Sequence, residues 1–243
     1  MPLPPSFEAR MVSARMLSPN VRELTFERVD GAAFGFEAGQ WVNLVLPGDP
    51  SPYRRAYSIA SAPDGSPRFE LAVTRVADGP GSGLLHAMSP GSVVRAEGPQ
   101  GFFTQGTNAG APALFVATGT GVTPMRSMIR DALAHGATSP LWLLFGNRTE
   151  DDVLYDDEWR ALEASHANVR AFRTLSRPGP SWTGRTGWVQ SHVPELWTEL
   201  AANGSVRPHV YVCGLVRMVN AVRELLKKDL GLPRQEIHTE RYD

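Results

Sequence analysis

The spacing of apolar residues changes once along the chain, near residue 105. Before that point, apolar and polar residues alternate in short segments that glycine and proline interrupt. Beyond it, apolar runs alternate with longer stretches of helical periodicity. Residues 105–112 (QGTNAGAP), between the two patterns, are small, polar and rich in turn formers. The change predicts two domains, residues 1–107 and 108–243.

The first half has the pattern of an antiparallel β-barrel or sandwich. Period-two alternation places one side chain inside and the next outside along each segment. The expected strands cover residues 10–17, 21–26, 41–46, 56–60, 69–75 and 93–97.

The second half has the pattern of an α/β domain, a parallel sheet with helices on both faces. Its expected strands cover residues 113–117, 141–145, 169–175 and 209–213, with a last strand near Gln235 and Ile237. Its expected helices cover residues 125–135, 157–164, 194–201 and 216–230.

Charge and cysteine content exclude several classes of protein. Lysine and arginine total 24 against 25 acidic residues, so neither nucleic acid nor membrane insertion is expected. Cys213 is the only cysteine, which excludes an internal disulfide and a four-cysteine cluster. The histidines lack metal-ligand spacing, so no metal site is expected. Without a signal sequence or a long apolar run, we expect a cytoplasmic protein.

The segment Arg55-Ala56-Tyr57-Ser58 has side chains suited to a flavin nucleotide. A guanidinium fork can hold a phosphate, a phenol ring can lie on an isoalloxazine face, and a hydroxyl can reach a ring nitrogen. Its expected strand ends before a turn at Pro63-Asp64-Gly65. The alternative is an ordinary barrel strand with an exposed arginine.

Two later segments of the first half add to this interpretation. Ser82 is expected to cap a short helix whose first amides could receive a pyrophosphate, although a capped helix that binds nothing remains the alternative. The segment Gly98-Pro99-Gln100-Gly101 predicts a tight turn. The two aromatic residues that follow, Phe102 and Phe103, either wall a flavin or pack in the core.

A glycine-rich loop follows the first strand of the second half, as Thr118-Gly119-Thr120-Gly121-Val122-Thr123-Pro124. We expect Pro124 to be the first helical residue after a Thr123 cap, with amides facing a pyrophosphate. The loop is not G-x-G-x-x-G, and no acidic residue follows about 20 residues later. An ordinary Rossmann dehydrogenase is therefore disfavoured.

Three polar residues follow the expected strand 169–175. Arg177 and Arg185 could neutralise the 2′-phosphate of NADP, which NAD lacks, with Ser176 as a further contact. We therefore favour NADPH over NADH as the donor. The alternative is a pair of arginines that face solvent in a loop rich in glycine and proline.

These motifs, in this order, resemble the ferredoxin-NADP reductase superfamily over nearly the whole chain, and most closely its short bacterial ferredoxin/flavodoxin reductases. The resemblance implies an antiparallel barrel that holds FAD, a second domain that holds NADP, and a monomer that meets ferredoxin or flavodoxin transiently. It places Arg55 and Ser82 at the FAD phosphates, and Tyr57 and Ser58 at the isoalloxazine. Further implied cofactor contacts are Ala56, Val73, Gly81, Thr120, Gly121, Thr123, Pro124 and Gly214.

The resemblance also marks the end of the chain. Glu240 is followed two residues later by Tyr242, which is expected to cover one face of the flavin. Ser58, Glu240 and Tyr242 are the implied catalytic residues, together with Cys213, to which we assign positioning at most since hydride transfer needs no thiolate. Asp243 stands where short bacterial relatives often have an aromatic residue at the adenine, so how the adenine is held stays open.

The expected function is an FAD-dependent oxidoreductase that passes hydride from NADPH to flavin and single electrons to ferredoxin or flavodoxin, or the reverse. One alternative is an NAD(P)H:flavin reductase or the reductase component of an oxygenase. A remote alternative is a non-catalytic redox-sensing module that binds nucleotides.

Overall fold

The computed structural model describes residues 4–202 and 206–242. The chain divides into two compact units. Unit 1 comprises Met1–Gln105 with Arg126–Asp131, and unit 2 comprises Gly106–Met125 with Ala132–Asp243. Each unit has a six-stranded sheet of its own.

Unit 1 is an antiparallel barrel, as the sequence predicts. Its strands lie in the order β4-β3-β6-β1-β2-β5, and an isolated bridge between Ile59 and Leu71 joins the two ends of the sheet. Closure leaves no long unpaired edge. The strands are β1 (Ser6–Ser18), β2 (Val21–Arg28), β3 (Trp41–Leu46), β4 (Tyr53–Ser58), β5 (Arg68–Thr74) and β6 (Val93–Gln100).

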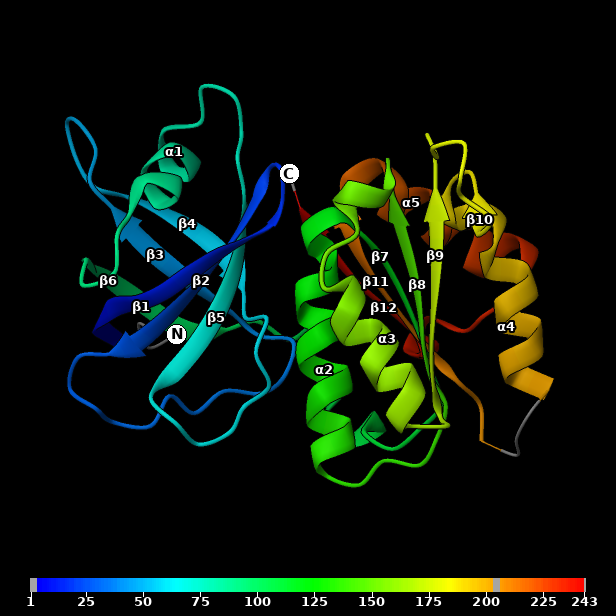
Figure 1. Ribbon diagram of the computed structural model, residues 1–243. Helices are drawn as coiled ribbons and strands as arrows, with labels where there is room; N and C mark the ends of the chain where they lie inside the picture. Colours follow the sequence, from blue (N-terminus) through cyan, green and yellow to red (C-terminus); the bar gives the residue numbers. More distant parts are fainter. Residues whose placement is uncertain (1–3, 203–205, 243) are drawn as a thin grey trace. The chain divides into compact units, whose positions relative to one another are not determined.

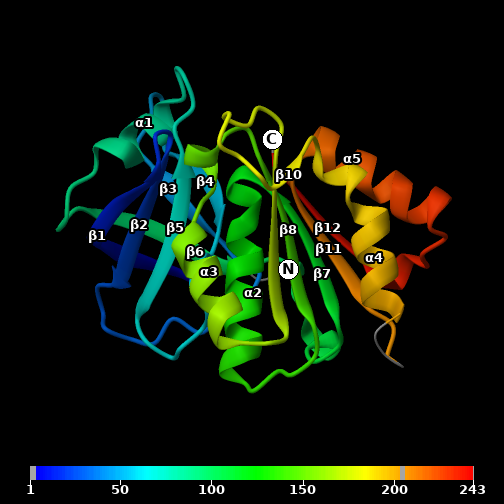
Figure 2. The same cartoon turned by 45° about the vertical axis from the view of Figure 1, so that its right-hand side comes forward.

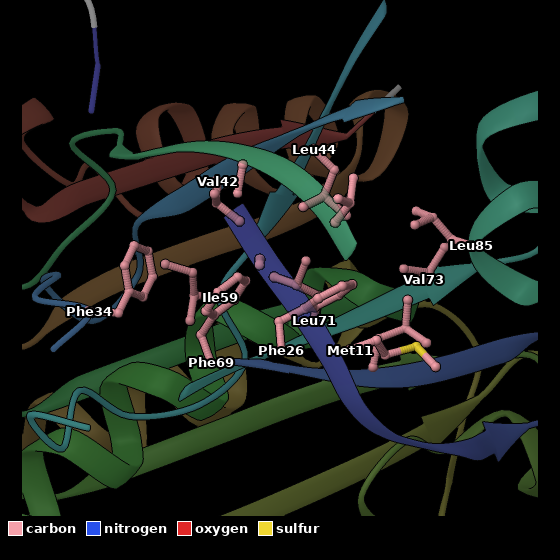
Figure 3. Close-up of a cluster of buried hydrophobic side chains, with 14 of the residues drawn as sticks. Met11, Phe26, Phe34, Val42, Leu44, Ile59, Phe69, Leu71, Val73 and Leu85 are labelled. Atoms are coloured by element: carbon pink, nitrogen blue, oxygen red, sulfur yellow. The ribbon is translucent and has the colours of Figure 1, made fainter. Parts of the chain in front are cut away.

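Apolar side chains from every strand of the barrel meet in one core, part of which is shown in Figure 3. Phe26 and Phe69 stack with ring centroids 5.6 Å apart, and Phe34 lies 4.7 Å from Phe69. Fully burying such a side chain contributes about 1.5–3 kcal/mol. The alternation seen in the sequence thus supplies the barrel interior.

One helix, α1 (Pro80–Ala87), packs on the barrel and is held at both ends. At its carboxyl end, Arg22 Nη1 donates to the carbonyl oxygens of Leu85, His86 and Met88 at 3.2, 2.5 and 2.9 Å. His86 Nε2 also lies 2.8 Å from the carbonyl oxygen of Val73, the cross-strand partner of Arg22. The bonds from Arg22 satisfy carbonyls that the end of the helix leaves unpaired, and the bond from His86 ties the helix to β5.

The amino end of α1 differs from the expectation that Ser82 caps it. The N-cap is Gly79, with proline at the first helical turn. Ser82 lies inside the helix, where its hydroxyl accepts from the amide of Val76 at 3.0 Å and donates to the carbonyl of Gly79 at 3.1 Å. Pro80 starts the helix three residues early because its fixed φ suits the first turn and its missing N–H costs nothing there.

Unit 2 is a parallel sheet with helices on both faces, again as predicted (Figure 1). The strand order is β10-β9-β8-β7-β11-β12, and every pair is parallel. The strands are β7 (Ala113–Thr118), β8 (Leu141–Asn147), β9 (Val169–Leu175), β10 (Arg185–Thr186), β11 (His209–Leu215) and β12 (Ile237–Tyr242).

The helices of unit 2 form two layers around this sheet. Figures 1 and 2 show α2 (Val122–Ala134) and α3 (Asp156–Ser165) on one side, with α4 (Val193–Ala202) and α5 (Val216–Glu224) on the other. Burial on both faces explains why β7 and β8 are apolar runs rather than alternating segments. Leu196 and Trp197 of α4 join Val219 and Val222 of α5 in the core on that side.

The order of the strands reverses between β7 and β11. The chain moves outward from β7 through β8 to β9, and then returns to place β11 on the other side of β7. In open sheets of this kind, ligands bind beyond the carboxyl ends of the strands at such a reversal. The two loops that leave β7 and β11 are therefore the first place to look for a nucleotide site.

Several expected boundaries move in the structure. The expected last strand begins at Ile237, because Gln235 lies in a 3-10 turn (Arg234–Glu236). The expected helix 216–230 is α-helical to Glu224 and continues as a π-helical turn, Leu225–Asp229. Gly98 and Pro99 continue β6, and the chain turns at Gly101, where φ is +102°.

Candidate functional site

Arg55 lies against the first turn of α1. A Cβ added to Gly81 would come within 3.3 Å of Arg55 Cγ, so glycine permits this close packing. The Arg55 guanidinium stacks on the Tyr53 ring at 4.7 Å and donates to the carbonyl of Arg54. An exposed guanidinium beside the start of a helix is an arrangement that suits a phosphate.

Tyr57 and Ser58 follow on the same strand with different exposure. Tyr57 is half-buried at the edge of the barrel core, and burial raises the pKa of its phenol to about 12 despite the nearby charge of Arg55. Its ring is therefore a neutral, partly exposed surface. Ser58 is buried, at 6% exposure.

The remaining flavin candidates take different positions. Ala56 is exposed on β4, and Gly81 and Ser82 are buried in the first half of α1. The Val73 side chain is buried in the barrel core, at 1% exposure. A cofactor can meet Val73 only through its backbone.

The two phenylalanines after Gly101 have opposite environments. Phe103 is 7% exposed and packs inside, whereas Phe102 is 93% exposed. Phe103 therefore packs in the core, whereas Phe102 does not.

The glycine-rich loop of unit 2 forms a 3-10 turn, Gly119–Gly121, that leads directly into α2. The helix begins at Val122, so Thr123 and Pro124 lie within its first turn rather than at the cap and first position that we expected. Thr123 Oγ1 donates to the carbonyl of Thr120 at 2.8 Å. The glycines extend the helical path backward, so the Val122 amide already donates to the carbonyls of Gly119 and Thr120.

Backbones approach closely where β7 and β11 end. A Cβ on Gly121 would collide with the carbonyl of Cys213, and one on Gly214, whose φ is +147°, would collide with Thr118 Oγ1. Only glycine fits at these two positions. The result is a cradle lined by backbone at the strand-order reversal, which suits a pyrophosphate.

Cys213, Glu240 and Tyr242 come together at the ends of β11 and β12. Cys213 pairs with Glu240 across the two strands, and Cys213 Sγ lies 4.0 Å from Glu240 Oε1. Burial, and next the Glu240 charge, raise the pKa of the Cys213 thiol well above its usual value. The thiol is therefore protonated near neutral pH and is a poor nucleophile.

The half-buried Tyr242 lies at the end of β12, and its hydroxyl is 3.4 Å from Thr123 Oγ1. The C-terminal candidates and the glycine-rich loop thus belong to one locality. Asp243 lies outside the described residues.

The three candidates for the 2′-phosphate do not share one environment. Ser176 and Arg177 are exposed just beyond the end of β9. Arg185 lies on β10, beside Thr174, and its guanidinium forms a two-bond ion pair with Glu195 of α4 at 2.7 and 2.8 Å.

Sequence reasoning missed Arg22 and Glu195. Both act through partners that no short motif joins to them: Arg22 bonds to carbonyls 63 to 66 residues away, and Glu195 faces an arginine on another element. For Glu195, the sequence offers one signal: an acidic residue stands ten residues after Arg185 and carries the opposite charge.

Two further structural observations bear on what the site can hold. Among residues 4–202 and 206–242, no three histidine, cysteine, aspartate or glutamate residues gather as a metal site. No helix in the same ranges is both long and apolar enough to cross a bilayer. The groups present in unit 1 fit a flavin nucleotide, and the glycine cradle of unit 2 fits a second nucleotide.

Comparison with known proteins agrees with this division. Residues 8–105 match the model of an oxidoreductase FAD-binding domain, and residues 115–224 match that of an oxidoreductase NAD-binding domain. Each model covers most of one unit.

One relative matches over nearly its whole length. The chain is 61% identical over 238 residues to ferredoxin–NADP reductase B of Sorangium cellulosum, and the match covers 98% of each protein. A crystal structure of an Amycolatopsis cytochrome P450 reductase matches 98% of this chain and 69% of its own, at 26% identity and a TM-score of 0.83. A Plasmodium falciparum ferredoxin-NADP+ reductase with 2′P-AMP covers 98% and 96%, at 20% identity and a TM-score of 0.82, and so shares the fold.

Proposed function

The chain belongs to the ferredoxin–NADP reductase family, and we propose that it passes hydride from NADPH to FAD and single electrons onward to ferredoxin or flavodoxin, or the reverse. It is an oxidoreductase with an FAD-binding and a nicotinamide-nucleotide-binding domain. The observation that carries the proposal is the 61% identity to a ferredoxin–NADP reductase over 98% of both chains.

The barrel would hold FAD through groups that the structure gathers around α1. Arg55 and the first amides of α1 would take the phosphates, and the neutral ring of Tyr57 would lie against the flavin. Ser58 would orient the ring through hydrogen bonds. The flavin itself supplies the chemistry, since it accepts a hydride and releases electrons one at a time.

The second unit would hold NADP at the carboxyl ends of β7 and β11. Thr120, Gly121, Thr123 and Pro124 would line the pyrophosphate, with Gly214 opposite. Ser176, Arg177 and Arg185 would meet the 2′-phosphate and so favour NADPH. That assignment accords with the 2′P-AMP in the Plasmodium structure, a property of that protein that we extend to this chain.

Residues at the end of β12 would control access to the flavin ring. Tyr242 would cover the ring and leave when the nicotinamide arrives, and Glu240 would hold a proton or charge beside it. Protonated Cys213 would position these groups and take no covalent part.

The proposal also covers the domain bounds, the location and the partners of the enzyme. The FAD-binding domain would comprise residues 1–107 and the NADP-binding domain residues 108–243. The protein would be a cytoplasmic monomer that meets its acceptor transiently. Ferredoxin follows from the name of the Sorangium relative, and flavodoxin from the similar one-electron chemistry.

A second candidate is the reductase component of an oxygenase, or a flavin reductase. The observation that favours it is the 26% identical cytochrome P450 reductase, whose chain is longer than the region matched here. Gel filtration of the purified yellow protein, followed by acceptor assays, separates the candidates. Tightly retained FAD with fast ferredoxin or flavodoxin reduction supports our proposal, whereas freely exchanging FMN or riboflavin supports a flavin reductase.

A further inference from the structure

Arg185 is held by a carboxylate in the structure. Its Nη1 and Nη2 atoms donate to Glu195 Oε2 and Oε1 at 2.7 and 2.8 Å. Such a parallel two-bond pair occupies the Nη1–Nη2 edge of the guanidinium, one of the edges through which arginine can grip a phosphate. Arg185 cannot bind both groups through that edge at once.

The rest of the Arg185 environment fixes where the guanidinium lies. It sits over the Phe172 ring at 5.5 Å, and Nη1 is 3.4 Å from His192 Nδ1. The backbone of Arg185 is fixed too, because its carbonyl accepts from Trp182 Nε1 at 2.9 Å and β10 pairs with β9. The side chain is thus directed toward α4.

The pair is nevertheless exchangeable. The side chain of Glu195 is 60% exposed and that of Arg185 27%. Exposed ion pairs are weakly held because water competes for both partners, and a dianionic phosphate carries more charge than a carboxylate. A dianionic phosphate can therefore displace the carboxylate, but only against its competition.

We propose that Glu195 sets the preference between NADPH and NADH by competing with the 2′-phosphate for Arg185. The inference rests on the proposed function, because it assumes that NADP lies at the ends of β9 and β10. NADH brings no 2′-phosphate and leaves the pair intact. The 2′-phosphate of NADPH either takes the Nη1–Nη2 edge from Glu195 or binds at Nε beside the Glu195 charge, so Glu195 lowers the advantage that Arg185 would otherwise give NADPH.

The chain offers a matched control on the same helix. Glu199, one turn after Glu195, pairs with Arg170 at 2.6 Å, and Arg170 lies over the same Phe172 ring at 5.1 Å. Glu195→Gln and Glu199→Gln make the same change of charge on the same element. Only the first releases Arg185.

The test is calorimetric binding of 2′,5′-ADP and 5′-AMP to the FAD-loaded protein at low salt. Glu195→Gln should tighten 2′,5′-ADP about three- to tenfold and leave 5′-AMP within twofold, as expected for removing one competing charge. Glu199→Gln should change neither by more than twofold. In the Arg185→Gln background the gain from Glu195→Gln should vanish.

Equal tightening by the two glutamine variants would show a general charge effect and overturn the proposal, as would equal tightening of both ligands. A failure of the proposed function can be distinguished from a failure of this inference. If the flavin of the wild type is reduced by NADH alone, the donor assignment is wrong, whereas the ratio of the two binding constants in Glu195→Gln still decides the role of Glu195.

Discussion

At the scale of single residues, Arg55 is the side chain on which we expect FAD binding to depend most. It is exposed, lies against the first turn of α1 and has the fork geometry that a phosphate needs. Arg55→Ala should weaken FAD at least tenfold, since charge-assisted hydrogen bonds contribute about 1.5–3 kcal/mol. The measurement is the flavin-to-protein absorbance ratio after desalting.

Arg68→Ala is the matched control for Arg55, because it removes a surface arginine of the same barrel that pairs with Glu27. It should keep its flavin. A desalted Arg55→Ala protein that remains fully yellow would remove Arg55 from the phosphate site.

At the scale of elements, helix α1 depends on Arg22, which bonds three carbonyls at the carboxyl end of the helix. If α1 presents its amides to FAD, then loosening one end should displace the other. Arg22→Met should raise the dissociation constant of FAD about tenfold, and Arg22→Lys should recover part of the loss. Fluorescence titration of the apoprotein with FAD measures both.

Arg10→Met, on the neighbouring strand β1, is the control for Arg22, since Arg10 is exposed there. FAD affinity within twofold of the wild type in a folded Arg22→Met protein would show that Arg22 does not position the site.

The edge strand β12 carries a pH-dependent contact. His238 stacks on Tyr211 at 4.4 Å and lies 3.0 Å from His209 Nδ1, and burial followed by the His209 charge lowers the pKa of His238 to about 4. Burial likewise lowers the pKa of His209, against the charge of Glu236. Because the unfolded chain binds protons more readily, this stability is complete above pH 6.5 and is lost as the pH falls toward 4.

His238→Gln should therefore flatten the pH dependence of the free energy of unfolding between pH 7 and pH 5, measured by urea titration. His166→Gln changes a half-buried histidine outside this contact and should leave that dependence as in the wild type. Parallel curves for the wild type and His238→Gln would contradict the assignment.

At the scale of the whole molecule, the alternating and continuous apolar patterns were enough to predict an antiparallel barrel or sandwich followed by a parallel α/β sheet, and the family resemblance selected the barrel. The residues at which individual helices begin were harder to predict. Pro80 moves the cap of α1 from Ser82 to Gly79, and Gly119–Gly121 forms a turn that starts α2 before Thr123. In both cases a backbone preference overrides the hydroxyl cap that the sequence suggested.

The candidate site follows the same division. Arg55, Tyr57 and the glycine-rich loop could be found because each is a local motif with its own chemistry. The ion pair between Glu195 and Arg185 and the bonds from Arg22 to α1 could not be found from the sequence, because only tertiary folding brings these groups together.

The central claim is that FAD in this protein accepts hydride from NADPH. Anaerobic stopped-flow mixing of the FAD-loaded protein with NADPH or NADH, followed at the flavin absorbance band, tests it most directly. We expect rapid bleaching with NADPH, a lower kcat/KM with NADH, and recovery of the colour when oxidised ferredoxin or flavodoxin is added. Flavin that stays oxidised with both nucleotides would contradict the claim and leave a non-catalytic binding protein.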